Sequence, residues 1–197
     1  IARRYTVNIP QIVTANYFLA LVLCYIFFRP DLIAVQTDAP WGIYISLGIL
    51  LPAIFLILAA SIKYMGIVKT DAAQRLSLFI PILAAWLLFG EKFNTLKITA
   101  FLIAFPALLL ILNKPSDNTK NKWIYPAFVL VGFGLIDILF KQIALFTYLP
   151  YTTSLFVVFG LALLLMAAVV GFEMVFKKIK LNYKNFLLGG LVGVFNF

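Results

Sequence analysis

Charged side chains are rare inside the apolar stretches of this sequence, so the few that occur there are the first candidates for chemistry. Asp137 and Lys141 are spaced i and i+4, and a helix places them on one face with the small residues Gly134 and Ala127. A carboxylate and an ammonium at this spacing can form a structural ion pair, or they can bind a substrate or a proton. The residues alone leave both alternatives open.

Polar residues in two other apolar stretches form a second group of candidates. Gln74 and Arg75 are adjacent but point to different sides of a helix, and Arg75 either lines a cavity or extends to the membrane surface. Asn16 and Tyr17 lie along a face of small and apolar residues, which fits either a helix contact or a cavity wall. With one tryptophan added, the candidates for a substrate cavity are Asn16, Tyr17, Gln74, Arg75, Trp86, Asp137 and Lys141.

Most other site chemistry is excluded by residue type. The chain has no histidine and one cysteine, Cys24, so it offers no histidine-based catalytic triad, no paired-cysteine metal site and no internal disulfide. It also has no Gly-x-x-x-x-Gly-Lys-Ser/Thr loop that could bind a nucleotide. We therefore expect no enzyme activity, no cofactor and no metal site.

Composition identifies the class of protein. Of 197 residues, 64% are hydrophobic and 12% are charged, whereas soluble domains have roughly 45 to 50% apolar and about 25% charged residues. The net charge of +9 comes from basic residues in short gaps between apolar runs, as is typical of membrane loops. These observations predict an integral membrane protein, and they argue against a soluble enzyme or a nucleic-acid-binding partner.

The elements that must position the candidate residues are membrane-spanning helices. Six apolar runs approach the roughly 20 residues that a bilayer requires, and a seventh is shorter. Helices are expected because lipid leaves backbone groups no other partner. Pro52, Pro81 and Pro106 lie inside runs and predict kinks, while Gly189 and Gly193 predict close helix packing. The runs are Pro10 to Phe28, Trp41 to Ile62, Ala72 to Phe89, Thr95 to Leu112, Trp123 to Tyr148, Thr152 to Val175, and about Lys184 to Phe197.

The run order repeats weakly across a polar linker at 114–122. A shift of 141 residues places Leu47-Gly48 on Leu188-Gly189 (189 minus 48 is 141) and overlays the first run on the run that begins near Tyr151. Because this shift contains five spans, an odd number, the two halves would have opposite orientations in the membrane. We therefore divide the chain into most of a first repeat (1–113), the linker (114–122) and the start of a second repeat (123–197).

The segment from Ala60 to Leu112 resembles one family of membrane proteins. It contains Phe-Ile-Pro, a short apolar run, then Leu-Leu-Phe-Gly-Glu-Lys-Phe and a further apolar run. This is similar to EamA-type carriers of the drug/metabolite transporter superfamily, in which a helix carries a central proline, here Pro81, and closes with an acidic residue after glycine, here Glu91. The resemblance implies structural roles for Pro81 and Glu91. Gly134 followed by Lys141 also fits this family's pattern.

The resemblance implies a fold of ten spans in two inverted five-helix repeats, of which this chain covers about spans two to eight. Ile1 is not an initiator methionine and the last run is too short to span, so we expect a bundle truncated at both ends. The function that this implies is secondary transport of a small organic metabolite, amino-acid-like or an organic anion, by alternating access. The alternative is a non-transporting structural or lipid-binding membrane protein.

Loop charges predict the orientation. Loops on one side, at 3–4, 63–75, 114–122 and 177–184, carry 12 of the 16 Lys and Arg residues, and the other side carries the remaining four. The positive-inside rule therefore places the 114–122 linker in the cytoplasm. The usual arrangement of the family would place it outside, and we follow the charges. We expect a bacterial inner (plasma) membrane, with a small-molecule substrate and membrane lipids as partners, and the oligomeric state is left open.

Overall fold

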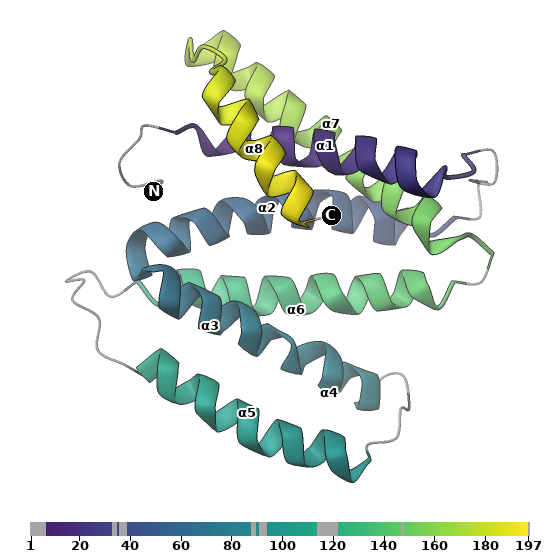
Figure 1. The fold of residues 1–197 in the computed structure, drawn as a ribbon, viewed down its shortest axis with the longest axis vertical. Helices are drawn as coiled ribbons and strands as arrows, with labels where there is room; N and C mark the ends of the chain where they lie inside the picture. Colours follow the sequence, from purple (N-terminus) through teal and green to yellow (C-terminus); the bar gives the residue numbers. More distant parts are fainter. Residues whose placement is uncertain are drawn as a thin grey trace. The chain divides into compact units, whose positions relative to one another are not determined.

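The computed structural model describes residues 7–32, 35, 39–87, 90, 94–113, 122–146 and 148–196, and within these ranges the chain forms helices and no strands (Figure 1). The fold is therefore all-α, as predicted. The helices in chain order are α1 (Ile9–Phe28), α2 (Trp41–Met65), α3 (Ile67–Ser77), α4 (Phe79–Leu87), α5 (Thr95–Asn113), α6 (Ile124–Ala144), α7 (Tyr151–Phe176) and α8 (Tyr183–Asn196).

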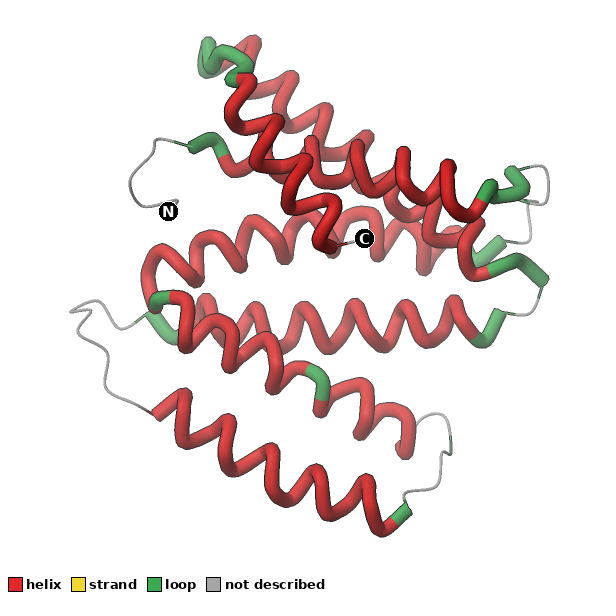
Figure 2. Tube along the Cα trace, viewed as in Figure 1, coloured by secondary structure: helices red, strands yellow, loops and turns green. Residues whose placement is uncertain are grey.

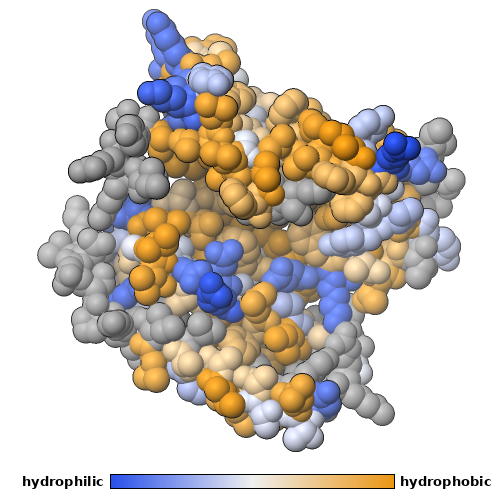
Figure 3. Space-filling view, viewed as in Figure 1, coloured by the Kyte–Doolittle hydropathy of each residue, from blue (hydrophilic) through white to orange (hydrophobic). Residues whose placement is uncertain are grey.

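Four of these helices, α1, α2, α6 and α7, are long and apolar enough to cross a membrane. Large apolar side chains point outward along them, since Phe18, Ile45 and Leu164 are 56%, 50% and 69% exposed. Apolar surface predominates over α1, α7 and α8, whereas hydrophilic atoms gather where α7 leads into α8 (Figure 3). Because water tolerates large apolar patches poorly, these faces fit contact with lipid. The chain is that of a membrane protein, as its composition predicts.

Local sequence sets both ends of α1. The side-chain oxygen of Asn8 accepts a hydrogen bond from the backbone N–H of Gln11 at 3.0 Å, and Pro10 occupies the first turn, where a helix does not need its missing N–H. At the other end Arg29 adopts φ 44°, and its N–H donates to the carbonyl of Tyr25 at 3.1 Å. This left-handed residue closes the helix.

The third apolar run forms two helices rather than one. The ladder of α3 stops at Leu78, whose N–H donates to the carbonyl of Arg75 at 3.3 Å, and α4 follows directly (Figure 2). Pro81 explains this break, because it has no N–H for the carbonyl of Ser77 and its ring crowds that carbonyl. Pro52 and Pro106 lie inside α2 and α5, which continue past them, so only one of the three predicted kinks breaks a helix.

The chain forms two compact units. The first contains Ile1–Leu56 and Gln142–Phe197, and the second contains Ile57–Lys141. This division follows contacts in space and cuts across the boundary expected at 114–122. It does not test the two inverted repeats, which stay a prediction.

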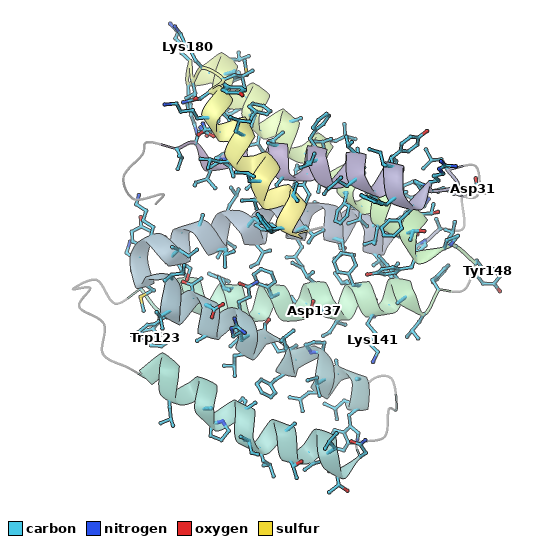
Figure 4. All side chains as sticks on the ribbon, viewed as in Figure 1. Asp31, Trp123, Asp137, Lys141, Tyr148 and Lys180 are labelled. Carbon is cyan, nitrogen blue, oxygen red and sulfur yellow. The ribbon has the colours of Figure 1, made fainter. Side chains whose placement is uncertain are left out.

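In the first unit α1 and α7 pack antiparallel against each other. Asn8, before the start of α1, bonds to Glu173 near the end of α7, and Cys24 near the end of α1 lies 3.7 Å from the carbonyl oxygen of Thr152 at the start of α7. Asp31 and Tyr148, which follow α1 and precede α7, accordingly lie at the same end, away from Lys180 (Figure 4).

The other two helices of this unit flank this antiparallel pair through glycine contacts. A Cβ added at Gly189 of α8 would lie 2.6 Å from the Cβ of Ala15, and one at Gly193 would lie 3.0 Å from the carbonyl oxygen of Asn16, so α8 follows α1 in the same direction. A Cβ at Gly48 of α2 would lie 2.8 Å from the Cβ of Leu161, so α2 follows α7. The close packing predicted for Gly189 and Gly193 is confirmed.

The second unit is built around α3. Its buried residues Ala72, Ala73 and Leu76 pack with Phe79 of α4 and Val129 of α6. The rings of Phe79 and Phe105 meet edge to face with centroids 5.3 Å apart, which brings in α5. The small alanines of α3 allow this close approach, because they add little bulk between helices.

Candidate functional site

Tyr17 is the central candidate in the first unit. It is the ninth of the 20 residues of α1, and it is only 2% exposed. Its ring meets Phe55 of α2 edge to face at 6.0 Å and Phe159 of α7 at 6.4 Å. The side chain therefore lies where α1, α2 and α7 come together, halfway along a helix that can span the membrane.

The hydroxyl group of Tyr17 has no hydrogen-bond partner in the described part of the chain, although it is fully buried. The hydroxyl of Thr153 is also buried and also has no hydrogen-bond partner among the described residues. By contrast Tyr44, also buried, shares a hydrogen bond of 2.8 Å with Ser154. A buried hydroxyl without a partner costs about 1 to 3 kcal/mol, and such a group in a native protein calls for an explanation.

Asn16 lies beside Tyr17 and is also buried, at 4% exposed. Its carbonyl oxygen and Cα lie under Gly193 of α8, so its backbone belongs to the contact between α1 and α8. The sequence left open whether this face of α1 forms a helix contact or a cavity wall. At the backbone of Asn16 it forms a contact with α8. At Tyr17 the unpartnered hydroxyl adds a second feature that packing alone does not explain.

A polar network closes one end of this unit around Gln11. Its side chain donates to the carbonyl of Lys180 at 3.0 Å and accepts from the backbone N–H of Asn182 at 3.1 Å and from the amide of Asn185 at 2.8 Å. Gln11 is 1% exposed. Both the oxygen and the nitrogen of this side chain are bonded within the protein, so the network ties the α7–α8 loop to the start of α1.

The other five predicted cavity residues belong to the second unit. Arg75 donates to Asp71 one turn earlier at 2.9 Å, and its side chain is 66% exposed. Gln74 is half-buried, and Trp86 near the end of α4 is 53% exposed. The Arg75 side chain is therefore exposed on this unit, which fits a side chain that extends to the membrane surface, and its place in a cavity stays a prediction. The predicted structural residue Glu91 lies outside the described residues.

Asp137 and Lys141 lie one turn apart in α6 and are both half-buried (Figure 4). Asp137 makes no hydrogen bond or ion pair with any residue in the described ranges, so the ion pair that their spacing allows does not form in this structure. Lys141 does have an interaction of its own. An ionisable residue inside a spanning helix normally faces protein or a wet cavity and marks a functional position.

Several residues with notable contacts in the structure were not identified as candidates from the sequence. Gln11 had a usable signal, since it lies three residues after the capping Asn8, inside an apolar run. Thr153 had none, because its lack of a partner depends on neighbours. Lys69 and Lys122 were considered only as loop charges, yet each lies over an aromatic ring. Among the described residues no group of three or more acidic or cysteine side chains could hold a metal ion.

The chain is similar to a bacterial protein. The chain is 35% identical to an uncharacterized protein of Haemophilus influenzae (strain Rd) over an alignment of 209 positions. This alignment spans 100% of this chain and 69% of that protein. No protein-family model matches the chain. No solved structure matches it. The resemblance to EamA-type carriers stays a prediction.

Proposed function

The chain belongs to the same family as the Haemophilus influenzae protein, and we propose that it acts as a secondary transporter. In this proposal a small organic metabolite, amino-acid-like or an organic anion, crosses a bacterial inner membrane by alternating access. The observation that carries the proposal is the buried, unpartnered hydroxyl of Tyr17 at the crossing of α1 and α7. Transporters of this type bind substrate near the midplane, at the interface of two repeats.

The packing of the first unit supports an inverted repeat. An inverted repeat in which α1 and α2 correspond to α7 and α8 has two consequences. First, α1 and α7 must run antiparallel. Second, α8 must pack beside α1, and α2 must pack beside α7. Both conditions hold in the contacts described above. Gly48 and Gly189, which the shift of 141 residues superposes (189 minus 48), both make close helix contacts.

In this proposal the same shift relates Tyr17 to a residue beside one of its own contacts. Adding 141 to 17 gives Val158, the neighbour of Phe159, whose ring contacts Tyr17. Because Tyr17 contacts the residue next to its own counterpart, it lies close to the approximate two-fold axis that the proposed repeat would have. This is where the two halves of an inverted-repeat transporter meet and where its substrate binds. A substrate carbonyl or carboxylate would give the Tyr17 hydroxyl the partner that it lacks.

The resemblance to EamA-type carriers belongs to the same proposal. Pro81, the proline on which the resemblance rests, interrupts the helical run between α3 and α4. Interrupted helices are common around transporter sites because they free backbone groups for binding. The alternative, a non-transporting structural protein, would use the buried polar groups only to lock helices together, as the Gln11 network does.

Replacement of Tyr17 by Phe tests the proposal, because it removes one oxygen atom and leaves the ring. The full-length protein is reconstituted in liposomes, and uptake of a radiolabelled mixture of amino acids and dicarboxylates is measured. Tyr17→Phe should keep the wild-type thermal stability or exceed it, because an unsatisfied buried group is removed, while uptake falls about tenfold, the equivalent of one hydrogen bond of about 1.4 kcal/mol.

Tyr44→Phe is the matched control. It leaves Ser154 without a partner, so stability should fall by about 1 to 3 kcal/mol while uptake per folded molecule stays at the wild-type level. Equal uptake by Tyr17→Phe and wild type would show that Tyr17 is structural. A wild-type protein that takes up none of these solutes, and whose melting temperature none of them shifts, would favour the non-transporting alternative.

A further inference from the structure

Lysines and aromatic rings converge at one end of the second unit, where α2 ends and α3 and α6 begin. We define the basic–aromatic cluster as these six residues: Lys63, Tyr64, Lys69, Lys122, Trp123 and Tyr125. From its contacts and charge we propose that this cluster binds the phosphate group of an anionic phospholipid in the cytoplasmic leaflet.

Stacked rings form the floor of the cluster. The rings of Tyr64 and Tyr125 lie 5.0 Å apart and are inclined by 21°, which joins the end of α2 to the start of α6. The ammonium group of Lys122 lies 4.2 Å from the centroid of Tyr64 and 6.0 Å from that of Tyr125. The ammonium group of Lys69 lies 4.9 Å from the centroid of Trp123. These distances fall within the range of cation–π attraction.

The corner that carries Lys69 is held by hydrogen bonds. Gly66 adopts φ +85°, which allows the chain to turn from α2 into α3 within one residue. Thr70 donates to the carbonyl of Gly66 at 2.9 Å and shares a hydrogen bond of 2.7 Å with Ser61. Lys69 is only 9% exposed. Its charge is therefore positioned by the fold rather than by a mobile loop.

The positive charges of the cluster are not balanced by acidic groups. Within the described ranges no carboxylate pairs with Lys63, Lys69 or Lys122, and the nearby Asp71 already bonds to Arg75 at 2.9 Å. The adjoining linker sequence adds Lys114 and Lys120 against the single Asp117. A ring face attracts an ammonium group without accepting conventional hydrogen bonds, so the N–H donors of these lysines stay available to phosphate oxygens.

The location of the cluster identifies the source of the phosphate. Tyr and Trp side chains at the ends of spanning helices lie at headgroup level, and the cluster lies where α2 ends and α6 begins. The loop charges predict that this end faces the cytoplasm, and anionic lipids are found in that leaflet. Basic pockets between helices on this side are a known way to hold anionic headgroups. A lipid phosphate therefore fits the site better than a free anion.

The experiment compares two double variants with the same loss of charge. In Lys69→Gln/Lys122→Gln two cluster lysines are replaced, and in Lys178→Gln/Lys184→Gln two exposed lysines at the end of the first unit are replaced. The full-length protein in neutral detergent is titrated with dioleoylphosphatidylglycerol, and binding is measured by native mass spectrometry and by thermal unfolding. Each lysine near an anionic headgroup contributes roughly fivefold in affinity, so the cluster variant should bind about thirtyfold more weakly than wild type.

The control variant should remain within about threefold of wild type, and dioleoylphosphatidylcholine should give no comparable shift. Equal binding by the two variants, or equal binding of the two lipids, would overturn the proposal. A shift produced by sodium phosphate as large as that produced by the anionic lipid would also overturn it, because the site would then take free phosphate. If the cluster variant does not fold, Lys122→Gln alone decides, with an expected loss of about fivefold against Lys178→Gln.

Discussion

Tyr17 and Tyr44 are both buried tyrosines of the first unit, and the surroundings of their hydroxyl groups differ. Tyr44 is paired with Ser154 near the start of α7, whereas Tyr17 is surrounded by the rings of Phe55 and Phe159. The first is a helix contact that stabilises the fold. The second has a hydroxyl with no hydrogen-bond partner within the described ranges, which is the property expected of a group that binds a ligand.

Asp137 is the second residue whose role can be measured directly. Because Asp137 and Lys141 form no ion pair in this structure, a double-mutant cycle with Asp137→Asn and Lys141→Met should give a coupling energy below about 0.5 kcal/mol. Asp137→Asn alone should leave the unfolding free energy unchanged or raise it, and should reduce uptake. A coupling energy above about 1 kcal/mol, measured by unfolding in mixed micelles, would show that the two residues do pair.

Gln11 should matter for stability alone. Gln11→Ala removes three hydrogen bonds and leaves the buried amide of Asn185 without its acceptor, so the unfolding free energy should fall by about 2 kcal/mol. Gln74→Ala is the control, because it is the same change at a half-buried position, and it should cost less than about 0.5 kcal/mol. Similar losses in the two variants would mean that the Gln11 network does not stabilise the fold.

At the scale of elements, two adjacent glycines of α8 differ in how closely they are packed, since Gly189 lies against α1 and Gly190 does not. A Cβ at Gly189 would meet the backbone of Ile12 and lie 2.6 Å from Ala15, whereas one at Gly190 would meet nothing within 4 Å. Gly189→Ala should therefore lower the melting temperature, with an overpacking cost of about 1 to 3 kcal/mol. Gly190→Ala should leave it unchanged or raise it, because alanine favours the helix. The reverse order would contradict the packing of α8 on α1.

Pro81 has a comparable role between α3 and α4. Its effect is local, because removing one backbone donor and crowding one carbonyl is enough to end a helical ladder. Pro52 and Pro106 do the same in principle, yet α2 and α5 continue past them. The type of residue predicts where a helix can break, but neighbouring contacts decide whether it does.

At the scale of the whole molecule, the orientation in the membrane can be tested at two exposed positions. Tyr148 precedes α7 and Lys180 follows it, so a spanning α7 separates them (Figure 4). In a Cys24→Ala background, a single cysteine at 148 or at 180 is labelled in intact cells with an impermeant thiol reagent. The loop charges predict labelling at 148 and protection at 180.

Labelling at 180 with protection at 148 would reverse the orientation and restore the arrangement implied by the resemblance to EamA-type carriers. It would also move the basic–aromatic cluster to the outer leaflet. Wild-type Cys24 should not react in either case, because it is 0% exposed. Permeabilised cells in which both cysteines react provide the control for accessibility.

The sequence alone predicted the membrane class, the all-helical fold and the approximate bounds of the helices other than α3 and α4, which it predicted as one run. It could do so because these properties depend on nearby residues: an apolar run of sufficient length must form a helix in lipid. The predicted start of the first run at Pro10 and its end at Phe28 agree with α1 within one residue. The close packing of Gly189 and Gly193 was also predictable, since their spacing places both on one helix face.

The tertiary structure decided which side chains have partners. Tyr44 and Ser154 are 110 residues apart, Gln11 and Asn185 are 174 apart, and no pattern within either segment indicates that they meet. The same holds for the basic–aromatic cluster, in which three helix ends bring together lysines and rings. In an almost uniformly apolar chain hydrophobicity does not distinguish one helix face from another. The packing of small residues and the geometry of the turns choose the faces that meet, and they leave the Tyr17 hydroxyl without a partner among the described residues.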